Sequence, residues 1–311
     1  SILLPFVLGC ALALWLYPMH ATIGTRFTVF ALFIGISLSV TAFPVLARIL
    51  TDRKLQGTPM GIVALTCAAV DDVTAWCLLA AVIAVAKSDP SSAVSTLVLT
   101  AGYVTLMLLV VRPVVLRFVD RTSAGVTSAS QGTMAIVVVA LVASALATEA
   151  AGAHAIFGAF LLGAIIPFDS VLARDLTSKL EDFVVVLLLP AFFAFTGMRT
   201  EVGLVSGAWE WFVCAVIIAV ASIGKFGGSY AAARIAGFDR HDAASLGILM
   251  NTRGLMELIV LNIGLDLGIL SPKLFTMLVL MAIATTLATT PVLDRVTRSR
   301  SRRDLRIAAL A

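Results

Sequence analysis

Long apolar stretches alternate with short polar segments along the whole chain. Most of the stretches contain about 20 residues, the length that an α-helix needs to cross the hydrocarbon core of a bilayer. The pattern therefore predicts ten transmembrane helices, at residues 2–18, 27–50, 59–86, 94–119, 131–149, 153–168, 182–198, 209–235, 242–266 and 272–294.

The composition agrees with a chain that lies almost entirely in the membrane. Sixty per cent of the 311 residues are hydrophobic, 13% are charged, and the mean hydropathy is +1.06. A soluble domain is nearer half apolar and a quarter charged. We therefore expect an all-α polytopic membrane protein. The sequence has no phosphate-binding loop, nucleophile triad or metal-ligand cluster, so we expect neither an enzyme nor a bound cofactor.

Lys and Arg residues are distributed unevenly between the connections. Sixteen of the 22 lie in the basic tail at 295–311 or at even-numbered connections and the span ends beside them, four lie at odd-numbered connections, and two lie deep inside spans. Cytoplasmic loops are enriched in Lys and Arg. We therefore expect both chain ends in the cytoplasm and a multi-pass protein of the bacterial inner (plasma) membrane. We interpret the tail as a topology anchor that also contacts anionic lipid, not nucleic acid.

Five ionisable residues interrupt the apolar spans. Each costs at least a few kcal/mol at the bilayer centre, so such side chains usually face a cavity or find partners. Two are adjacent in the third span and a third lies near the middle of the eighth, at a similar depth. The five are Asp71, Asp72, Lys225, Arg253 and Glu257.

Asp71 and Asp72 are expected to face different surroundings. Adjacent residues on a helix point about 100° apart, so one carboxylate can face a water-filled cleft while the other faces a partner such as Lys225. A buried salt bridge that only fixes helix packing is the alternative. Two carboxylates against one ammonium leave a spare negative charge, which favours a site where a proton and a cation exchange.

Arg253 and Glu257 are four residues apart in the ninth span. That spacing places them on one helix face, where they can form an ion pair. We favour a structural pair and leave a share in gating open.

The second span is predicted to be broken near Pro44, in SVTAFPVLARIL. Proline lacks an amide hydrogen and its ring clashes with the preceding turn. The hydroxyls of Ser39 and Thr41 can cover some of the backbone groups that the break releases.

A second break is predicted in the ninth span, where Asn251, Thr252, Arg253 and Gly254 interrupt GILMNTRGLMEL. Spans one to three and eight to ten then form two triplets, each with a broken middle helix, and the charge count makes them run in opposite senses. Paired broken helices in inverted halves indicate a transporter with a site at the midplane of the membrane.

Six motifs resemble one family, the monovalent cation:proton antiporters, in the branch with bacterial Kef-type and GerN-type proteins and plant cation/proton exchangers. They cover nearly the whole chain in the same order. The motifs are TAFPVLARIL, AAVDDVTAW, HAIFGAFLLGAIIP, LLPAFFAFTGMRT, GKFGG and NTRGLMELIVLNIG.

The resemblance implies roles for individual residues. Asp72 matches the carboxylate that alternately binds cation and proton, Asp71 the position before it, and Lys225 the basic residue on the facing helix. Thr41 and Asn251 match the two helix crossovers and would lend oxygens, with Ser39 and Thr252 beside them. Na⁺ or K⁺ would be the transported ion at Asp72 and Asp71, and the resemblance also implies a homodimer.

The resemblance further implies a division of the single transmembrane domain 1–311. Core helices would occupy about 1–86 and 209–294, with linking and dimer-panel helices at about 94–198. Relatives have further leading helices, which we expect to be missing here. We predict a secondary active antiporter that works by alternating access. A cation channel and a non-transporting sensor with the same fold are the alternatives.

Overall fold

The structure is a computed structural model that describes residues 1–87, 90–123, 130–151 and 155–308. Side chains are described except at 84, 87–97, 120–129, 152–154 and 297–311. Helices account for 84% of the residues, and the described part of the chain has no β-strand. The protein is an all-α polytopic membrane protein, as predicted.

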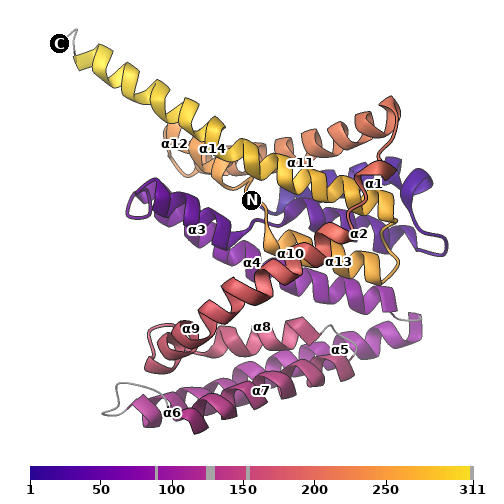
Figure 1. Ribbon diagram of the computed structural model, residues 1–311, viewed down its shortest axis with the longest axis vertical. Helices are drawn as coiled ribbons and strands as arrows, with labels where there is room; N and C mark the ends of the chain where they lie inside the picture. Colours follow the sequence, from indigo (N-terminus) through magenta and orange to yellow (C-terminus); the bar gives the residue numbers. More distant parts are fainter. Residues whose placement is uncertain (88–89, 124–129, 152–154, 309–311) are drawn as a thin grey trace. The chain divides into compact units, whose positions relative to one another are not determined.

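Two compact units make up the chain, and each is described by itself. The first comprises residues 1–79 and 198–311, and the second comprises residues 80–197. Figure 1 shows the helices of both, with colour following the sequence. The assignment of 94–198 to a dimer panel stays a prediction.

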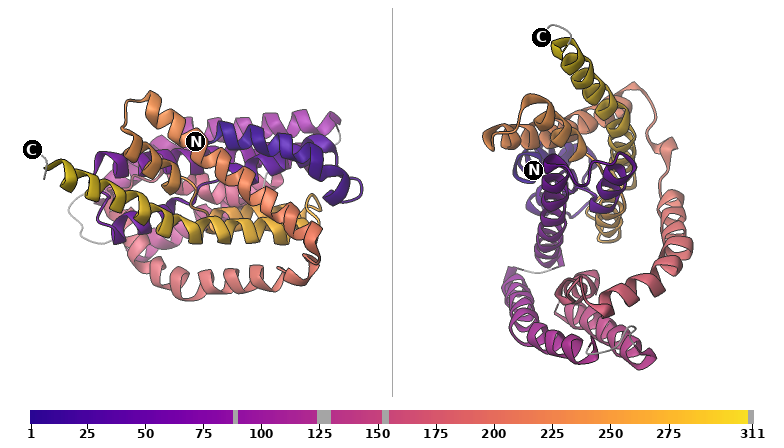
Figure 2. Two further views of the ribbon diagram at one scale, coloured as in Figure 1. Left: turned by 90° about the horizontal axis from the view of Figure 1, so that it is seen from above. Right: turned by 90° about the vertical axis from the view of Figure 1, so that its left-hand side faces the viewer.

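The first unit contains two triplets of helices, each with a broken middle member (Figures 1 and 2). The first triplet is α1 (Leu3–His20), the pair α2 (Phe27–Ser39) and α3 (Phe43–Asp52), and α4 (Pro59–Lys87), which continues into the second unit. The second triplet is α11 (Ala208–Ile235), the pair α12 (Arg240–Leu249) and α13 (Leu255–Asp266), and α14 (Pro272–Ala308). A short 3₁₀ turn at Val202–Leu204 precedes α11.

Small residues allow a close helix contact in this unit. Gly9 on α1 faces Gly35 on α2, and a Cβ atom added at Gly9 would lie 2.8 Å from the Cα atom of Gly35. Without side chains at these positions the two backbones approach directly, as is common where membrane helices pack. α1 also contacts α11, so the two triplets share an interface.

The second unit contains the end of α4 and the helices that follow it. These are α5 (Pro90–Leu106), α6 (Arg112–Ser123), α7 (Gln131–Ala150), α8 (Ala155–Ile165), α9 (Val171–Phe183) and α10 (Leu189–Met198). Single π-helical turns at Met107–Val111 and Val184–Leu188 join α5 to α6 and α9 to α10.

Eight helices are long and apolar enough to cross a membrane by length and composition, among the residues described. The two other predicted spans correspond to the 11-residue helix α8 and to the α12–α13 pair. Both predicted breaks are present: residues 40–42 separate α2 from α3, and residues 250–254 separate α12 from α13. Pro44 lies in the first turn of α3, where its missing amide hydrogen costs no bond.

Two predicted boundaries differ from the structure by more than ten residues. The helix expected at 182–198 begins at Val171, with the hydroxyl of Ser170 accepting from the amide of Ala173. Hydrophobicity identified only the apolar half, whereas the preceding turns are polar and amphipathic. The helix expected to end at residue 294 continues through the basic tail to Ala308. Arg is a good helix former, and the tail's side chains from residue 297 onward lie outside the described residues.

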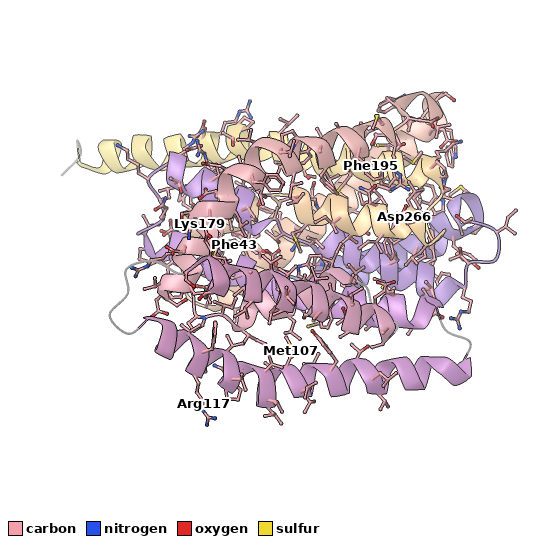
Figure 3. The ribbon with its side chains drawn as sticks, turned by 60° about the horizontal axis from the view of Figure 1, so that its bottom comes forward. Phe43, Met107, Arg117, Lys179, Phe195 and Asp266 are labelled. Atoms are coloured by element: carbon pink, nitrogen blue, oxygen red, sulfur yellow. The ribbon has the colours of Figure 1, made fainter. Side chains whose placement is uncertain are left out.

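Contacts between connections join even-numbered connections to each other and odd-numbered connections to each other. In the first unit Arg53 in the second connection pairs with Asp294 beside the tail. Lys273 and Glu210, at the ninth and seventh connections, pair at 2.7 Å. In the second unit α6 contacts α9, and Figure 3 shows Arg117 on α6 pointing away from the ribbon. This arrangement fits a chain that alternates between two faces.

Candidate functional site

The two helix breaks meet in the interior of the first unit. The amide of Ala42 donates to the carbonyl oxygen of Thr252 at 3.0 Å, and the Thr41 hydroxyl lies 3.2 Å from the carbonyl oxygen of Met250. Thr41 and Thr252 are fully buried. Each break leaves backbone groups without helical hydrogen bonds, and buried groups of this kind need partners. The two breaks therefore supply some of these partners to each other.

Gly254 makes the close crossing possible. A Cβ atom there would lie 2.8 Å from Cγ2 of Val45 on α3 and 3.3 Å from Cβ of Ala42. Its φ of 176° is ordinary extended backbone. The requirement for glycine is therefore one of space and not of conformation.

Asp71 and Lys225 form an ion pair beside this crossing. Nζ of Lys225 lies 3.1 Å from Oδ2 of Asp71, and it donates to the Thr41 hydroxyl oxygen at 2.5 Å. The same Oδ2 lies 3.0 Å from the Thr41 hydroxyl, and Oδ1 accepts from the Ser1 hydroxyl at 2.5 Å. Asp71 is 2% exposed and Lys225 is 0% exposed. Helices α4 and α11 thus meet the first break through one network of charge and hydroxyl groups.

Asp72 lies outside this network. It is partly buried, and its Oδ1 is a buried acceptor that no hydrogen bond reaches within the described chain. The structure therefore separates the two adjacent carboxylates as a helix must: Asp71 faces the lysine, and Asp72 is left with an unsatisfied oxygen.

Arg253 connects the second break to the end of α2. Its two Nη atoms donate to the carbonyl oxygens of Ser37 and Leu38, each at 2.7 Å. Nη1 also lies 2.6 Å from Oε2 of Glu257, and both charged side chains are buried. The guanidinium caps the negative end of α2, while Glu257 lies in the positive first turn of α13. The predicted pair is present, in a position that matches helix dipoles.

The remaining predicted residues bond mainly to backbone. Ser39 donates to the carbonyl oxygen of Gly35 at 2.6 Å, and Thr252 donates to that of Leu249 at 2.9 Å. Asn251 donates to the Ser222 hydroxyl at 3.5 Å. Only Thr41 of the crossover group contacts Asp71, so Asn251 is not brought to the carboxylates in this arrangement.

Thr286 on α14 is a site residue that sequence reasoning missed. Its hydroxyl accepts from the Arg253 amide at 2.9 Å and donates to the Arg253 carbonyl oxygen at 2.8 Å. The hydroxyl thereby replaces helical bonds that the break removes. The only signal in the sequence is a run of threonines, ATTLATT, in an otherwise apolar span.

Neutral oxygens are needed if the site is to hold a cation. Within the described residues no three His, Cys, Asp or Glu side chains lie close enough together to hold a metal ion. Carboxylate, hydroxyl and carbonyl oxygens are the ligands that hard cations prefer, and Asp72 and the crossover carry groups of these kinds.

Comparisons with known proteins give one consistent result. Residues 1–296 match the family of transmembrane sodium/hydrogen exchangers. The Na⁺/H⁺ antiporter NhaS4 of Synechocystis sp. is 46% identical over 298 residues, which are 95% of this chain and 72% of that protein.

Two eukaryotic relatives also have names that describe cation/H⁺ antiporters. Cation/H⁺ antiporter 20 of Arabidopsis thaliana is 38% identical over 94% of this chain, and K⁺/H⁺ antiporter 1 of Saccharomyces cerevisiae is 34% identical over 94%. The chain spans 36% and 34% of the lengths of these two proteins.

Proposed function

Because this chain belongs to the sodium/hydrogen exchanger family, we propose that it is a secondary active antiporter that exchanges Na⁺ or K⁺ for protons. Relatives named as Na⁺/H⁺, K⁺/H⁺ and cation/H⁺ antiporters support this class of substrate. Membership of this family makes the chain a multi-pass membrane transporter and not an enzyme.

The observation that carries the proposal is the unpartnered carboxylate of Asp72 beside a neutralised pair. Asp71 and Lys225 cancel each other's charge, so Asp72 remains as a net negative charge in an apolar unit. Leaving such a charge partly desolvated is costly unless a counter-charge arrives. A proton or a monovalent cation provides that counter-charge, and the two compete for one oxygen site.

Competition at Asp72 couples the two fluxes. Deprotonation of Asp72 admits a cation and protonation expels it. The site therefore does not readily change its access to the other side of the membrane when Asp72 is charged and empty, or when it holds both ions. Alternating access then requires movement of the crossover region. Thr41 is placed to respond, because its single hydroxyl hydrogen can bond to either Asp71 or the Met250 carbonyl oxygen.

The remaining expectations form part of the same proposal. The clustering of Arg and Lys in even connections supports cytoplasmic chain ends, in a bacterial inner membrane. A homodimer that uses helices within 94–198 as its panel is proposed from the family resemblance.

The test is exchange in proteoliposomes that contain a pH-reporting dye. Addition of Na⁺ or K⁺ to the wild type should drive proton movement, and Asp72→Asn should abolish it with both ions. Asp52→Asn is the matched control, because Asp52 is an exposed carboxylate paired with Arg48 at the end of α3. It should exchange at the wild-type rate.

Two results would overturn the assignment. Cation flux that is independent of the proton gradient would indicate a channel. A folded wild type that moves neither ion against protons would indicate a sensor. Proton-coupled exchange that persists in Asp72→Asn would remove that carboxylate from the mechanism.

A further inference from the structure

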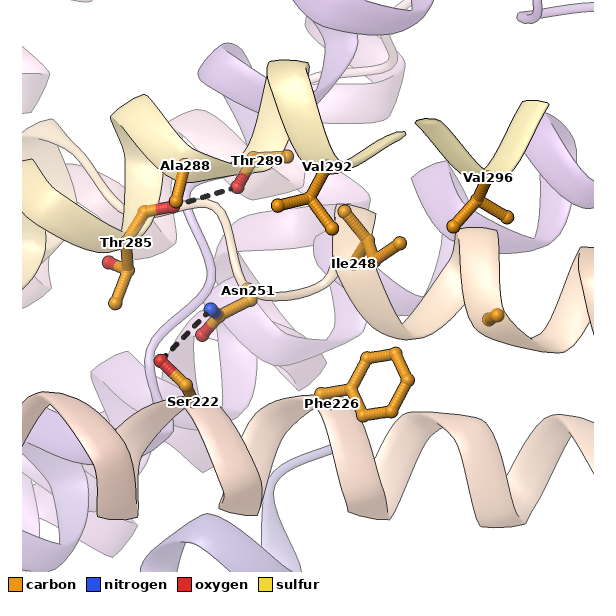
Figure 4. A pocket seen from close by; sticks show the side chains of 10 residues that line it. Ser222, Phe226, Ile248, Asn251, Thr285, Ala288, Thr289, Val292 and Val296 are labelled. Atoms are coloured by element: carbon orange, nitrogen blue, oxygen red, sulfur yellow. Dashed lines mark hydrogen bonds between the residues drawn. The ribbon is translucent and has the colours of Figure 1, made fainter. Parts of the chain in front are cut away.

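A cavity of about 360 Å³ lies inside the first unit, apart from the carboxylates (Figure 4). Helices α11, α12 and α14 form its walls, and the second break reaches it through Asn251. Its volume is within the range of about 300–1,000 Å³ that is usual for small-molecule sites. The proposed exchange does not use this space.

The polar groups gather at the end of the cavity beside the break. Oδ1 of Asn251 is a buried acceptor without a hydrogen bond among the described residues, and Ser222, Thr285 and Thr289 also line the cavity. Thr285 and Thr289 donate to carbonyl oxygens of their own helix. Oδ1 of Asn251 therefore lacks a donor, which an occupant of the cavity can supply.

The other end of the cavity is apolar. Phe226, Ile248 and Val292 line it, and no charged side chain does. Phe226 is 38% exposed and Val292 is 39% exposed, and each belongs to a candidate span. An occupant therefore needs an alkyl part and reaches the cavity by partitioning into the bilayer.

The lining of the cavity favours a neutral donor. No charged side chain lines it, so an ammonium head would lose its hydration there without a carboxylate to compensate its charge, whereas a hydroxyl group carries no charge. We propose that this cavity binds a small neutral amphiphile, a primary alcohol whose hydroxyl donates to Asn251 and whose alkyl chain packs against Phe226, Ile248 and Val292.

Binding there should restrain the crossover. Met250 and Thr252, on either side of Asn251, contact Thr41 and Ala42 through their carbonyl oxygens. A ligand that joins Asn251 to α11 and α14 favours one arrangement of the break. It shifts the conformational equilibrium only by the difference between its affinities for the two arrangements. The alcohol is therefore expected to slow any movement of the break.

The test uses a photoreactive six-carbon primary alcohol with a diazirine near its methyl end, applied to the whole chain in lipid nanodiscs. Mass spectrometry should locate the adduct on α11 or α14 near Phe226 or Val292. Excess 1-hexanol should reduce labelling at least fivefold, whereas n-hexane at an equal membrane concentration should not. This readout does not depend on transport.

Matched variants on α14 separate the cavity from the lipid surface. Ala288→Phe fills the cavity and should abolish the adduct, whereas Ile283→Phe, at a half-exposed position that does not line it, should keep it. Ala244→Leu on α12 provides a second filling variant if Ala288→Phe fails to fold. Undiminished labelling of the filled variants, equal competition by n-hexane, or stronger competition by hexylammonium would each overturn the proposal.

Discussion

Lys225 and Asp71 lie 3.1 Å apart although they are 154 positions apart in the sequence, and neither is more than 3% exposed at the side chain. Among the described residues, the ammonium is bonded to one carboxylate and one hydroxyl, so it depends on Asp71 for its charge compensation. A buried pair of this kind stabilises less than its geometry suggests, because both ions lose hydration. Removal of one member alone is costly, because the other ion is then buried without a partner.

Removal of one member of this pair should destabilise the protein more than removal of both. Asp71→Asn or Lys225→Met leaves an uncompensated buried charge, at a cost of about 3–5 kcal/mol. Asp71→Asn with Lys225→Met should recover most of that loss, measured by denaturant unfolding in detergent. The matched pair Arg48–Asp52 is 78% and 54% exposed at the side chains and should change stability by about 1 kcal/mol or less. If the double variant loses as much stability as the two single variants together, Asp71 and Lys225 do not compensate each other's charge.

Cation binding to Asp72 should appear as thermal stabilisation. A ligand that binds only the folded state stabilises it by about 2.7 kcal/mol at one hundred times its Kd. The wild type should therefore show a rise in Tm with Na⁺ or K⁺ that Asp72→Asn lacks. The rise should shrink as the pH falls, because a proton on Asp72 removes the charge that attracts the cation. An equal rise in the variant would place the cation elsewhere.

The Arg253 guanidinium should not be replaceable by an ammonium. Its fork reaches two carbonyl oxygens of α2 and Glu257 together, whereas a Lys side chain provides a single compact charge. Arg253→Lys should lower the free energy of unfolding by about 2 kcal/mol, in the range for losing hydrogen bonds to a charged group. The control Arg48→Lys, at an exposed position, should be neutral. If Arg253→Lys is also neutral, the cap on α2 contributes nothing to stability.

Local chemistry made much of this arrangement predictable from the sequence. Pro44 and the polar run at 251–254 break helices through their own backbone effects, so both breaks were correctly predicted. The contacts of Arg253 with Ser37 and Leu38 could not be predicted, because they form only when two breaks that are distant in the sequence cross. Which of Asp71 and Asp72 faces Lys225 depends on the rotation of α4, which helix packing determines. The start of the α9–α10 helix was missed because its first turns are amphipathic and contain no continuous apolar run.

Gly254 gives a direct test of the crossing. Gly254→Ala places a Cβ atom 2.8 Å from Val45 Cγ2, and overpacking of this kind costs about 1–3 kcal/mol. Adding Val45→Ala removes the clashing methyl groups and should restore part of the loss, measured by unfolding in detergent. Gly57→Ala is the control, since nothing lies within 4 Å of a Cβ atom there. If Gly254→Ala is as stable as Gly57→Ala, position 254 tolerates a Cβ atom. The two breaks then lie farther apart than the hydrogen bond between Ala42 and Thr252 indicates.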